Sequence, residues 1–316
     1  MGRFLTTRLL TLAATLAVAS VVVFLALDIL PGNAALTLLG ADAAPEAVAA
    51  LTRKLGLDRP AMERYFAFAA GLLHGDFGTS AAYDTPAVAL IGERLAVSLP
   101  LALMAMCLTI AMALALGLFA ASRRGTWADT GAMALAQTGM ALPNFWLAIL
   151  LVLLFAVHLH WLPAGGFPGW DSGLWPGLRA LLLPALSLAL VQAAVLARVT
   201  RSSVLDVLGQ DFVRTARAKG LSQGEVLRRH VLRNALAPVL AIAGLQFANL
   251  VASAIVIENV FSLPGLGRLI FQSIGNRDTV VVRDCVLLLA AFVIAVNFVM
   301  DVLAALADPR LKTRTA

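Results

Sequence analysis

The sequence predicts an all-α, polytopic membrane protein with six transmembrane helices and both termini in the cytoplasm. Hydrophobic residues make up 60% of the 316-residue chain, and the mean hydropathy is +0.89. Charged residues make up only 13%, about half of the ~25% that is usual in soluble domains. The apolar residues are also gathered into long runs, and a helix needs about 20 of them to cross a bilayer.

Six runs qualify as spans. The first follows Arg3 and Arg8, and Ala17-Val18-Ala19 within it resembles a signal-peptide cleavage site. We interpret it as an uncleaved span, because the apolar run continues well past the length of a signal-type hydrophobic region. The predicted spans are Leu9–Leu30, Ala96–Ala120, Ala132–Val157, Leu181–Thr200, Val239–Val260 and Val286–Leu306.

The distribution of basic residues predicts the orientation, since cytoplasmic loops carry the excess of Lys and Arg. With both termini inside, the inner segments hold fourteen basic and five acidic residues, whereas the outer segments hold nine basic and ten acidic ones. The net charge of +6 is therefore interpreted first as a topology signal.

Residues 31–95 form the longest predicted extracytoplasmic segment of what we expect to be a single transmembrane domain, residues 1–316. Pro45–Leu55 and Pro60–Leu73 each have the pattern of a helix with proline at its start. The segment is interpreted either as a platform for a substrate-delivering protein or as a cap packed on the spans, and the two are compatible.

Residues 201–237 form the most basic predicted cytoplasmic loop. A first short helix, Phe212–Lys219, is expected to end at Gly220, which can adopt the left-handed conformation that closes a helix. A second helix is expected to start at Ser222, with Glu225 completing a capping box. The pattern indicates an amphipathic elbow at the membrane surface that docks a soluble partner.

This loop resembles the EAA loop of ABC-importer permeases, in the variant found in dipeptide, oligopeptide and nickel permeases. Arg214-Thr215-Ala216 stands where the general pattern has Glu-Ala-Ala, and Gly220 stands at its glycine. Further short motifs of the family follow in order along nearly the whole chain: Leu30-Pro31-Gly32, Gly75-Asp76-Phe77-Gly78, Glu93-Arg94-Leu95, Phe145-Trp146-Leu147-Ala148, Trp161-Leu162-Pro163, Pro264-Gly265-Leu266-Gly267 and Asp308-Pro309-Arg310.

The resemblance implies a multi-pass permease subunit in the bacterial cytoplasmic (inner) membrane. It implies a second, usually paralogous, permease subunit, two ATP-binding subunits and an extracytoplasmic solute-binding protein as partners, besides the lipid bilayer. The residues that it implies for docking the ATP-binding subunit are Arg214, Thr215, Ala216, Lys219, Gly220, Leu221, Arg228 and Arg229.

Several other classes of function lack their sequence features. None of the three lysines follows a glycine, so no nucleotide-binding P-loop can be written and ATP hydrolysis is expected on a separate chain. Gly220–Gly224 matches G-x-S-x-G, but the strand that a nucleophile elbow requires is missing. We therefore predict no catalytic residue and no cofactor. No metal site is predicted either, because His158 and His160 have no identifiable third ligand. Nucleic-acid binding is not expected, since the basic loop is flanked by membrane spans.

Polar residues within the spans are the candidates for a solute pathway. Gln246, Asn249 and Ser253 fall on one face of the fifth span, and Gln137 and Asn144 are seven residues apart in the third. Such residues are expected to face protein or a water-filled cavity. We favour a pathway lining for the fifth span, with helix–helix hydrogen bonding as the alternative.

The solute itself is predicted from ligand chemistry alone. The neutral hydrogen-bonding groups of the fifth span suit short peptides, and no span shows the clustered His, Cys or carboxylate ligands that a nickel ion would use. A nickel or nickel-chelate permease of the same family stays as the alternative. A self-contained secondary carrier is less favoured, because it would not need a docking elbow.

Overall fold

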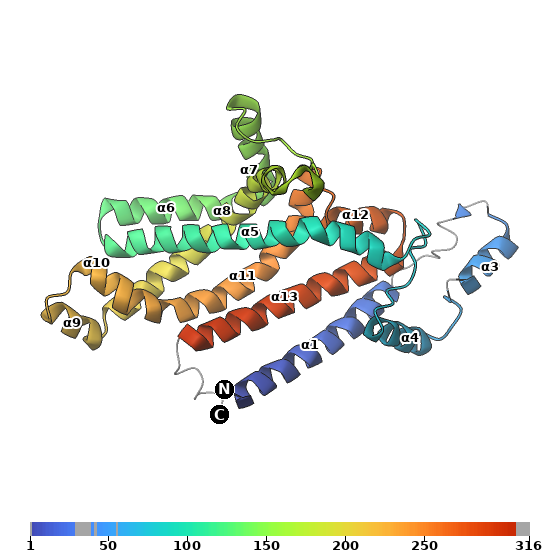
Figure 1. Ribbon diagram of the computed structural model, residues 1–316, viewed down its shortest axis with the longest axis horizontal. Helices are drawn as coiled ribbons and strands as arrows, with labels where there is room; N and C mark the ends of the chain where they lie inside the picture. Colours follow the sequence, from blue (N-terminus) through green and yellow to red (C-terminus); the bar gives the residue numbers. More distant parts are fainter. Residues whose placement is uncertain (1, 29–38, 41–42, 55, 308–316) are drawn as a thin grey trace. The chain divides into compact units, whose positions relative to one another are not determined.

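The computed structural model describes residues 2–28, 39–40, 43–54 and 56–307. Within these residues every regular element is a helix, so the predicted all-α class is confirmed (Figure 1). The helices are α1 (Gly2–Asp28), α3 (Pro45–Lys54), α4 (Ala61–Leu73), α5 (Ala87–Ser122), α6 (Trp127–Ala141), α7 (Asn144–Leu151), η1 (Val152–His158), η2 (Trp170–Ser172), α8 (Leu174–Leu208), α9 (Asp211–Ala218), α10 (Gln223–Glu225), η3 (Val226–Val231), α11 (Leu232–Val260), α12 (Leu266–Gly275) and α13 (Thr279–Ala307).

Five of the predicted spans lie within unbroken helices of the described part, in α1, α5, α8, α11 and α13. The last two residues of the predicted first span, 29 and 30, lie outside the described residues. The helices are longer than the predicted spans. Helix α5, for example, has 36 residues, about 54 Å at 1.5 Å per residue, whereas the hydrocarbon core of a bilayer is about 30 Å thick. The apolar pattern therefore predicted the centres of the helices but few of their ends, of which the end of α11 at Val260 is one.

The third predicted span, Ala132–Val157, is not one straight helix. Helix α6 and the α7–η1 segment meet at an angle of 106°. Leu142 has an extended backbone, with φ −86° and ψ 131°, because Pro143 disfavours the helical conformation of the residue before it. The prediction of a single continuous span was therefore wrong at this bend, which also separates Gln137 from Asn144, so the two do not share a helix face.

The chain divides into two compact units. The first comprises Met1–Leu9, Pro100–Leu263 and Ala295–Ala316. Its core lies along α8, which packs against α6, α7 and α11. The packing is close, since a Cβ at Gly117 would lie 2.6 Å from the Cβ of Thr200. Glycine at position 117 is thus what allows α5 to approach α8.

The second unit comprises Leu10–Leu99 and Pro264–Ile294. The start of α5 packs there against α12 and the start of α13 through a cluster that includes Ile91, Ile270 and Val281. The predicted outer helices appear as α3 and α4, and Phe24 of α1 contacts Tyr65 of α4 edge to face. The end predicted for the first of them, Leu55, lies outside the described residues.

Candidate functional site: a basic elbow and a polar stripe

The elbow, residues 211–233, begins with α9 and turns at Gly220, as the sequence predicts. Gly220 has φ +82°, its N–H donates to the carbonyl of Arg217 and the N–H of Leu221 donates to the carbonyl of Ala216. These two bonds form a Schellman motif. After the turn, Ser222 and Glu225 form the predicted capping box. The local geometry of the elbow is thus specified by a few residues of its own sequence.

An apolar cluster holds the elbow against the bundle. Val213 and Ala216 of α9 are buried together with Val226 and Val231. On the bundle side the cluster is completed by residues from the ends of α5 and α8, which are Ala121, Val204 and Val207. Burial of these side chains ties the elbow to the ends of two long helices.

The second half of the elbow continues into α11 through the π-helical turn η3. In the sequence, Leu227, Val231 and Ala235 are spaced four residues apart, which predicts that they share one apolar face of an α-helix. Val231 and Ala235 are buried, but Leu227 is half-buried and Val226 takes the buried position. A π-helical turn brings residues five apart onto one face, so Val226 rather than Leu227 aligns with Val231.

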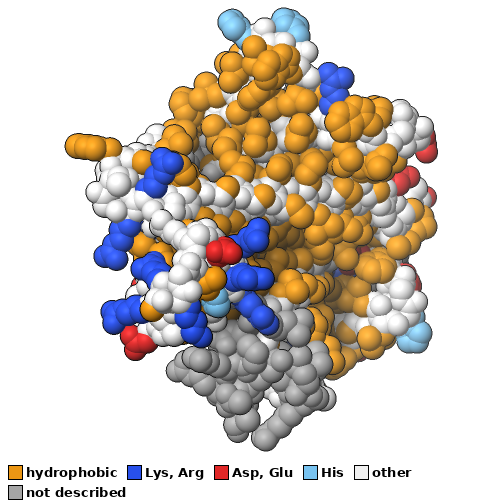
Figure 2. Space-filling view, turned by 60° about the vertical axis from the view of Figure 1, so that its left-hand side comes forward, with side chains coloured by type: hydrophobic (Ala, Val, Ile, Leu, Met, Phe, Trp, Pro, Cys, Tyr) orange, Lys and Arg blue, Asp and Glu red, His pale blue; other side chains and the backbone are white. Residues whose placement is uncertain are grey.

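The cations of the elbow are exposed. Arg214, Arg217, Lys219, Arg228, Arg229 and Arg233 are all on the surface, and Figure 2, which brings the α9–α10 end of Figure 1 forward, shows Lys and Arg side chains gathered there. The ion pair recorded within the described elbow joins Arg214 to Asp211 at 3.2 Å, with both side chains largely in solvent. Such a pair contributes little. The surface is therefore strongly positive.

The residues predicted to dock an ATP-binding subunit divide into two groups. Arg214, Thr215, Lys219, Gly220, Arg228 and Arg229 are exposed. Leu221 is half-buried and Ala216 is buried within the apolar cluster. Ala216 thus supports the elbow from within, and the outward surface consists of the exposed group.

An ion pair at the base of the elbow was not predicted. Arg201 of α8 donates two hydrogen bonds to Asp129 of α6, Nε to Oδ1 at 2.6 Å and Nη2 to Oδ2 at 2.7 Å. Asp129 is 4% exposed and also accepts from the backbone N–H of Gly125. No sequence pattern predicts this contact, because the two residues are 72 positions apart in the chain.

The predicted pathway residues lie on α11, where they are partly bonded inside the bundle. The Asn249 amide donates to Oε1 of Gln246 at 3.0 Å, and Ser253 accepts from Nδ2 of Asn144 at 2.8 Å. Gln246 is buried and Asn249 is exposed. We call Gln246, Asn249 and Ser253 the polar stripe, and Asn249 is the member that the bundle leaves open.

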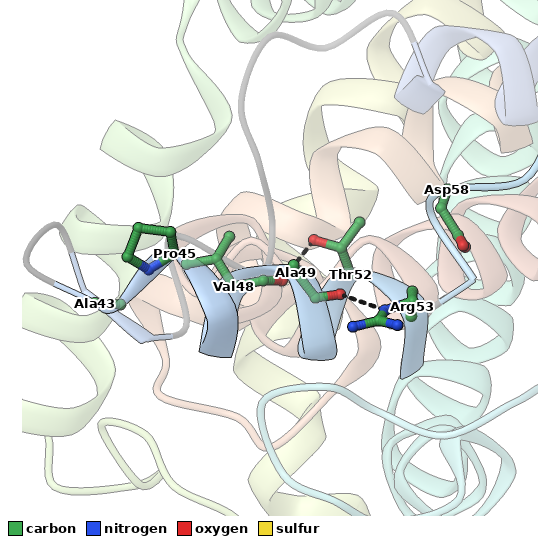
Figure 3. A pocket seen from close by; sticks show the side chains of 7 residues that line it. All are labelled: Ala43, Pro45, Val48, Ala49, Thr52, Arg53 and Asp58. Carbon is green, nitrogen blue, oxygen red and sulfur yellow. Dashed lines mark hydrogen bonds between the residues drawn. The ribbon is translucent and has the colours of Figure 1, made fainter.

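Three further features are candidate functional sites: a metal site, the carboxylate of Asp301 and a groove on α3. No group of three or more His, Cys, Asp or Glu side chains suited to a metal ion occurs among the residues described, so the absence of a metal stays a prediction. Asp301, near the end of the last span, pairs with Arg8 at 2.8 Å. A shallow open groove on α3 is lined by residues from 43 to 58 (Figure 3). Its Thr52 and Arg53 bond to carbonyls of their own helix.

A set of apolar helices of membrane-crossing length, with a packed basic elbow next to α8 and α11, defines a polytopic integral membrane protein. Two family profiles cover the chain. Residues 113–313 match the binding-protein-dependent transport system inner membrane component, and residues 1–112 match the N-terminal part of such membrane components. The chain belongs to this family and is a multi-pass protein of the bacterial inner membrane. The predicted family resemblance is confirmed.

Relatives agree with this assignment. The chain is 44% identical to a protein of Brucella abortus (strain 2308) provisionally named as a peptide transport system permease, over 93% of this chain and 94% of the relative. It is 37% identical to the dipeptide transport system permease protein DppB of Alkalihalophilus pseudofirmus, over 96% and 98% of the two chains. It is 40% identical to the glutathione transport system permease protein GsiC of Salmonella choleraesuis, over 96% and 97%.

A solved structure shares the fold. A chain of the MetNI methionine ABC transporter in an inward-facing conformation matches with a TM-score of 0.53 at 17% identity, covering 69% of this chain and 96% of that one. At this identity the match concerns the fold alone.

Proposed function

We propose that the chain is the permease subunit of an ATP-binding cassette importer of short peptides, and that it docks an ATP-binding subunit through the elbow. Membership of the binding-protein-dependent transport family supports the permease role. The relatives named above support a peptide solute, because their names specify peptide, dipeptide and glutathione transport.

The packed, positively charged elbow is the observation that carries the docking role. Its apolar face is occupied by the cluster with α5 and α8, so the exposed cations remain for a partner. Complementary charge steers association and selects partners more than it adds affinity. The ATP-binding subunit that fits this surface presents carboxylates around its docking cleft.

The complete importer contains this chain, a second permease subunit, two ATP-binding subunits and an extracytoplasmic solute-binding protein. Closure of the ATP-binding pair would displace the elbow and switch the paired permeases between inward-open and outward-open states. Only a partner that binds the two states with different affinities can drive that switch.

In this arrangement both termini and the elbow are cytoplasmic and residues 31–95 are outside. Single cysteines at Asp58, Arg124 and Arg228, in a background without Cys107 and Cys285, would be treated in intact cells with an impermeant thiol reagent. We expect position 58 to be labelled and positions 124 and 228 to be protected. The reverse pattern would overturn the orientation.

The solute is tested by uptake in a strain that lacks this chain. Growth on an essential amino acid supplied as a di- or oligopeptide is measured beside nickel-dependent hydrogenase activity. We expect loss of peptide use with hydrogenase activity unchanged. Loss of the nickel phenotype alone would leave the permease assignment standing and remove the peptide solute.

A further inference from the structure

The ion pair between Asp129 and Arg201 is built as a rigid connection. Two parallel bonds of 2.6 and 2.7 Å fix the guanidinium against the carboxylate, and the N–H of Gly125 adds a third bond to Asp129 at 3.1 Å. The backbone N–H of Asp129 donates in turn to the hydroxyl of Thr126. A bidentate pair constrains direction as well as distance. Helix α6 is therefore held to α8 at a defined angle near its first turn.

The pair lies next to the elbow. Val204, three residues after Arg201 on α8, is fully buried in the cluster that holds Val213 and Val231 of the elbow. Ala121, at the end of α5, belongs to the same cluster, and Gly125 follows it in the turn to α6. A displacement of the elbow thus acts on the end of α8 at the point where α8 is tied to α6.

The other end of α6 lies next to the polar stripe. Helix α6 packs along α8 and ends at Ala141. After the bend at Pro143, the first residue of α7 is Asn144, which donates to Ser253 at 2.8 Å. The Oδ1 atom of Asn144 is buried without a hydrogen-bond partner, so the donation to Ser253 is the hydrogen bond that orients this side chain. The Asn144–Ser253 bond therefore connects the segment that follows α6 to α11.

We propose that the Asp129–Arg201 pair is a positioning strut, which transmits displacement of the elbow through α6 to the bend at Pro143 and the Asn144–Ser253 contact. This inference rests on the proposed function, because the docked ATP-binding subunit supplies the displacement. With the strut intact, α6 moves together with α8. Without it, the elbow still docks through its exposed cations, but α6 no longer follows, and ATP hydrolysis is uncoupled from import.

The test measures coupling rather than activity alone. The complete importer, with its partner permease, ATP-binding subunits and binding protein, is reconstituted into vesicles, and ATP hydrolysed and peptide imported are counted together. For Asp129→Asn we expect ATP-binding subunits to co-purify at wild-type yield and the ATP consumed per peptide to rise about tenfold, within the usual range of coupling between sites.

The matched control is another ion pair of the same unit. Asp301→Asn removes a carboxylate from the pair between Arg8 and Asp301, whose bond is 2.8 Å. That pair joins α1 to α13 and involves neither α6 nor the elbow. We expect the ATP consumed per peptide to stay at the wild-type value.

A second variant keeps the test decisive if Arg201, which is half-buried, harms the fold once it has lost its partner. Asp129→Asn combined with Arg201→Gln replaces the ion pair by neutral groups of similar shape. Because both substitutions remove one strut, we expect the double variant to be no more uncoupled than Asp129→Asn alone, as residues in contact are not additive.

Three results would overturn the strut. The first is an unchanged ratio in the assembled Asp129→Asn complex, and the second is a double variant that is more uncoupled than Asp129→Asn alone. The third is loss of the ATP-binding subunits from both variants, which would assign the pair to the folding of the docking surface. Failure of the proposed function is visible separately, since the wild-type complex would then hold no ATP-binding subunit or import no peptide.

Discussion

The elbow and the polar stripe differ in where their polar groups lie. In the elbow the apolar side chains face the bundle and the cations are exposed. In the stripe, Ser253 accepts a hydrogen bond from Asn144 of α7 and Gln246 accepts one from Asn249 of the same helix, so part of the hydrogen-bonding capacity is used inside the bundle. The elbow therefore exposes all of its cations to a partner, whereas in the stripe Ser253 joins α11 to α7, Gln246 is buried and Asn249 alone is exposed.

The largest effect is expected where the elbow depends on one backbone conformation. Gly220→Pro cannot adopt the φ of +82°, since proline fixes φ near −65°, and it removes the N–H that donates to Arg217. We expect peptide uptake to be abolished while membrane insertion stays intact, measured by transport and by the amount of chain in membranes. Wild-type transport would mean that the loop is an ordinary connection.

The next effect concerns the exposed cations. Arg228→Glu combined with Arg229→Glu removes two positive charges and introduces repulsion toward an acidic partner. Exposed ion pairs contribute roughly 0.2–1 kcal/mol each, so the ATP-binding subunit should bind about tenfold more weakly. The wild-type interaction should weaken with added salt. Arg53→Glu on α3 is the matched control, and equal weakening by that control would contradict docking at the elbow.

A smaller effect shows whether glycine is needed at position 220 for its backbone conformation or for the space around it. A Cβ at Gly220 or at Gly224 would meet nothing within 4 Å, but only Gly220 has a positive φ. Gly220→Ala should therefore lower stability by about 1 kcal/mol. Gly224→Ala, within α10, should be neutral or stabilising by up to about 1 kcal/mol. Thermal unfolding of the two variants in detergent checks the difference, and equal shifts would refute it.

The smallest effect shows whether Ser253 of the polar stripe mainly joins two helices or lines the pathway. Ser253→Ala leaves Nδ2 of Asn144 without its acceptor and should cost about 0.6 kcal/mol, typical of hydrogen bonds between membrane helices. Thr138→Ala is the control, because Thr138 bonds only to the carbonyl of Ala134 in its own helix. We expect a lower melting temperature for Ser253→Ala alone. An altered KM for uptake with unchanged melting would instead place Ser253 in the pathway.

The sequence predicted the features that depend on local chemistry. The apolar runs indicated where the helices lie, Gly220 indicated the turn, and Ser222 with Glu225 indicated the capping box. Hydropathy alone did not show the break at Pro143, since the residues on both sides are apolar. The proline itself was the available signal, because it disfavours a helical residue before it.

Features that depend on the packing between helices were not predictable. Ala216 was expected on the docking surface through its place in the motif, but its burial depends on α5 and α8. The π-helical turn that exchanges Leu227 for Val226 has no simple sequence pattern. The pair of Asp129 and Arg201 joins residues 72 positions apart, and only the packing of α6 on α8 brings them together.

The docking role of the elbow is tested most directly by cross-linking in the assembled importer. A photoreactive amino acid is placed at Lys219, on the exposed side of the elbow, or at Asp58, after α3. Irradiation of membranes that contain all subunits should join position 219 to the ATP-binding subunit and leave that subunit unlinked at position 58. A cross-link to the ATP-binding subunit from position 58, with none from position 219, would contradict docking at the elbow.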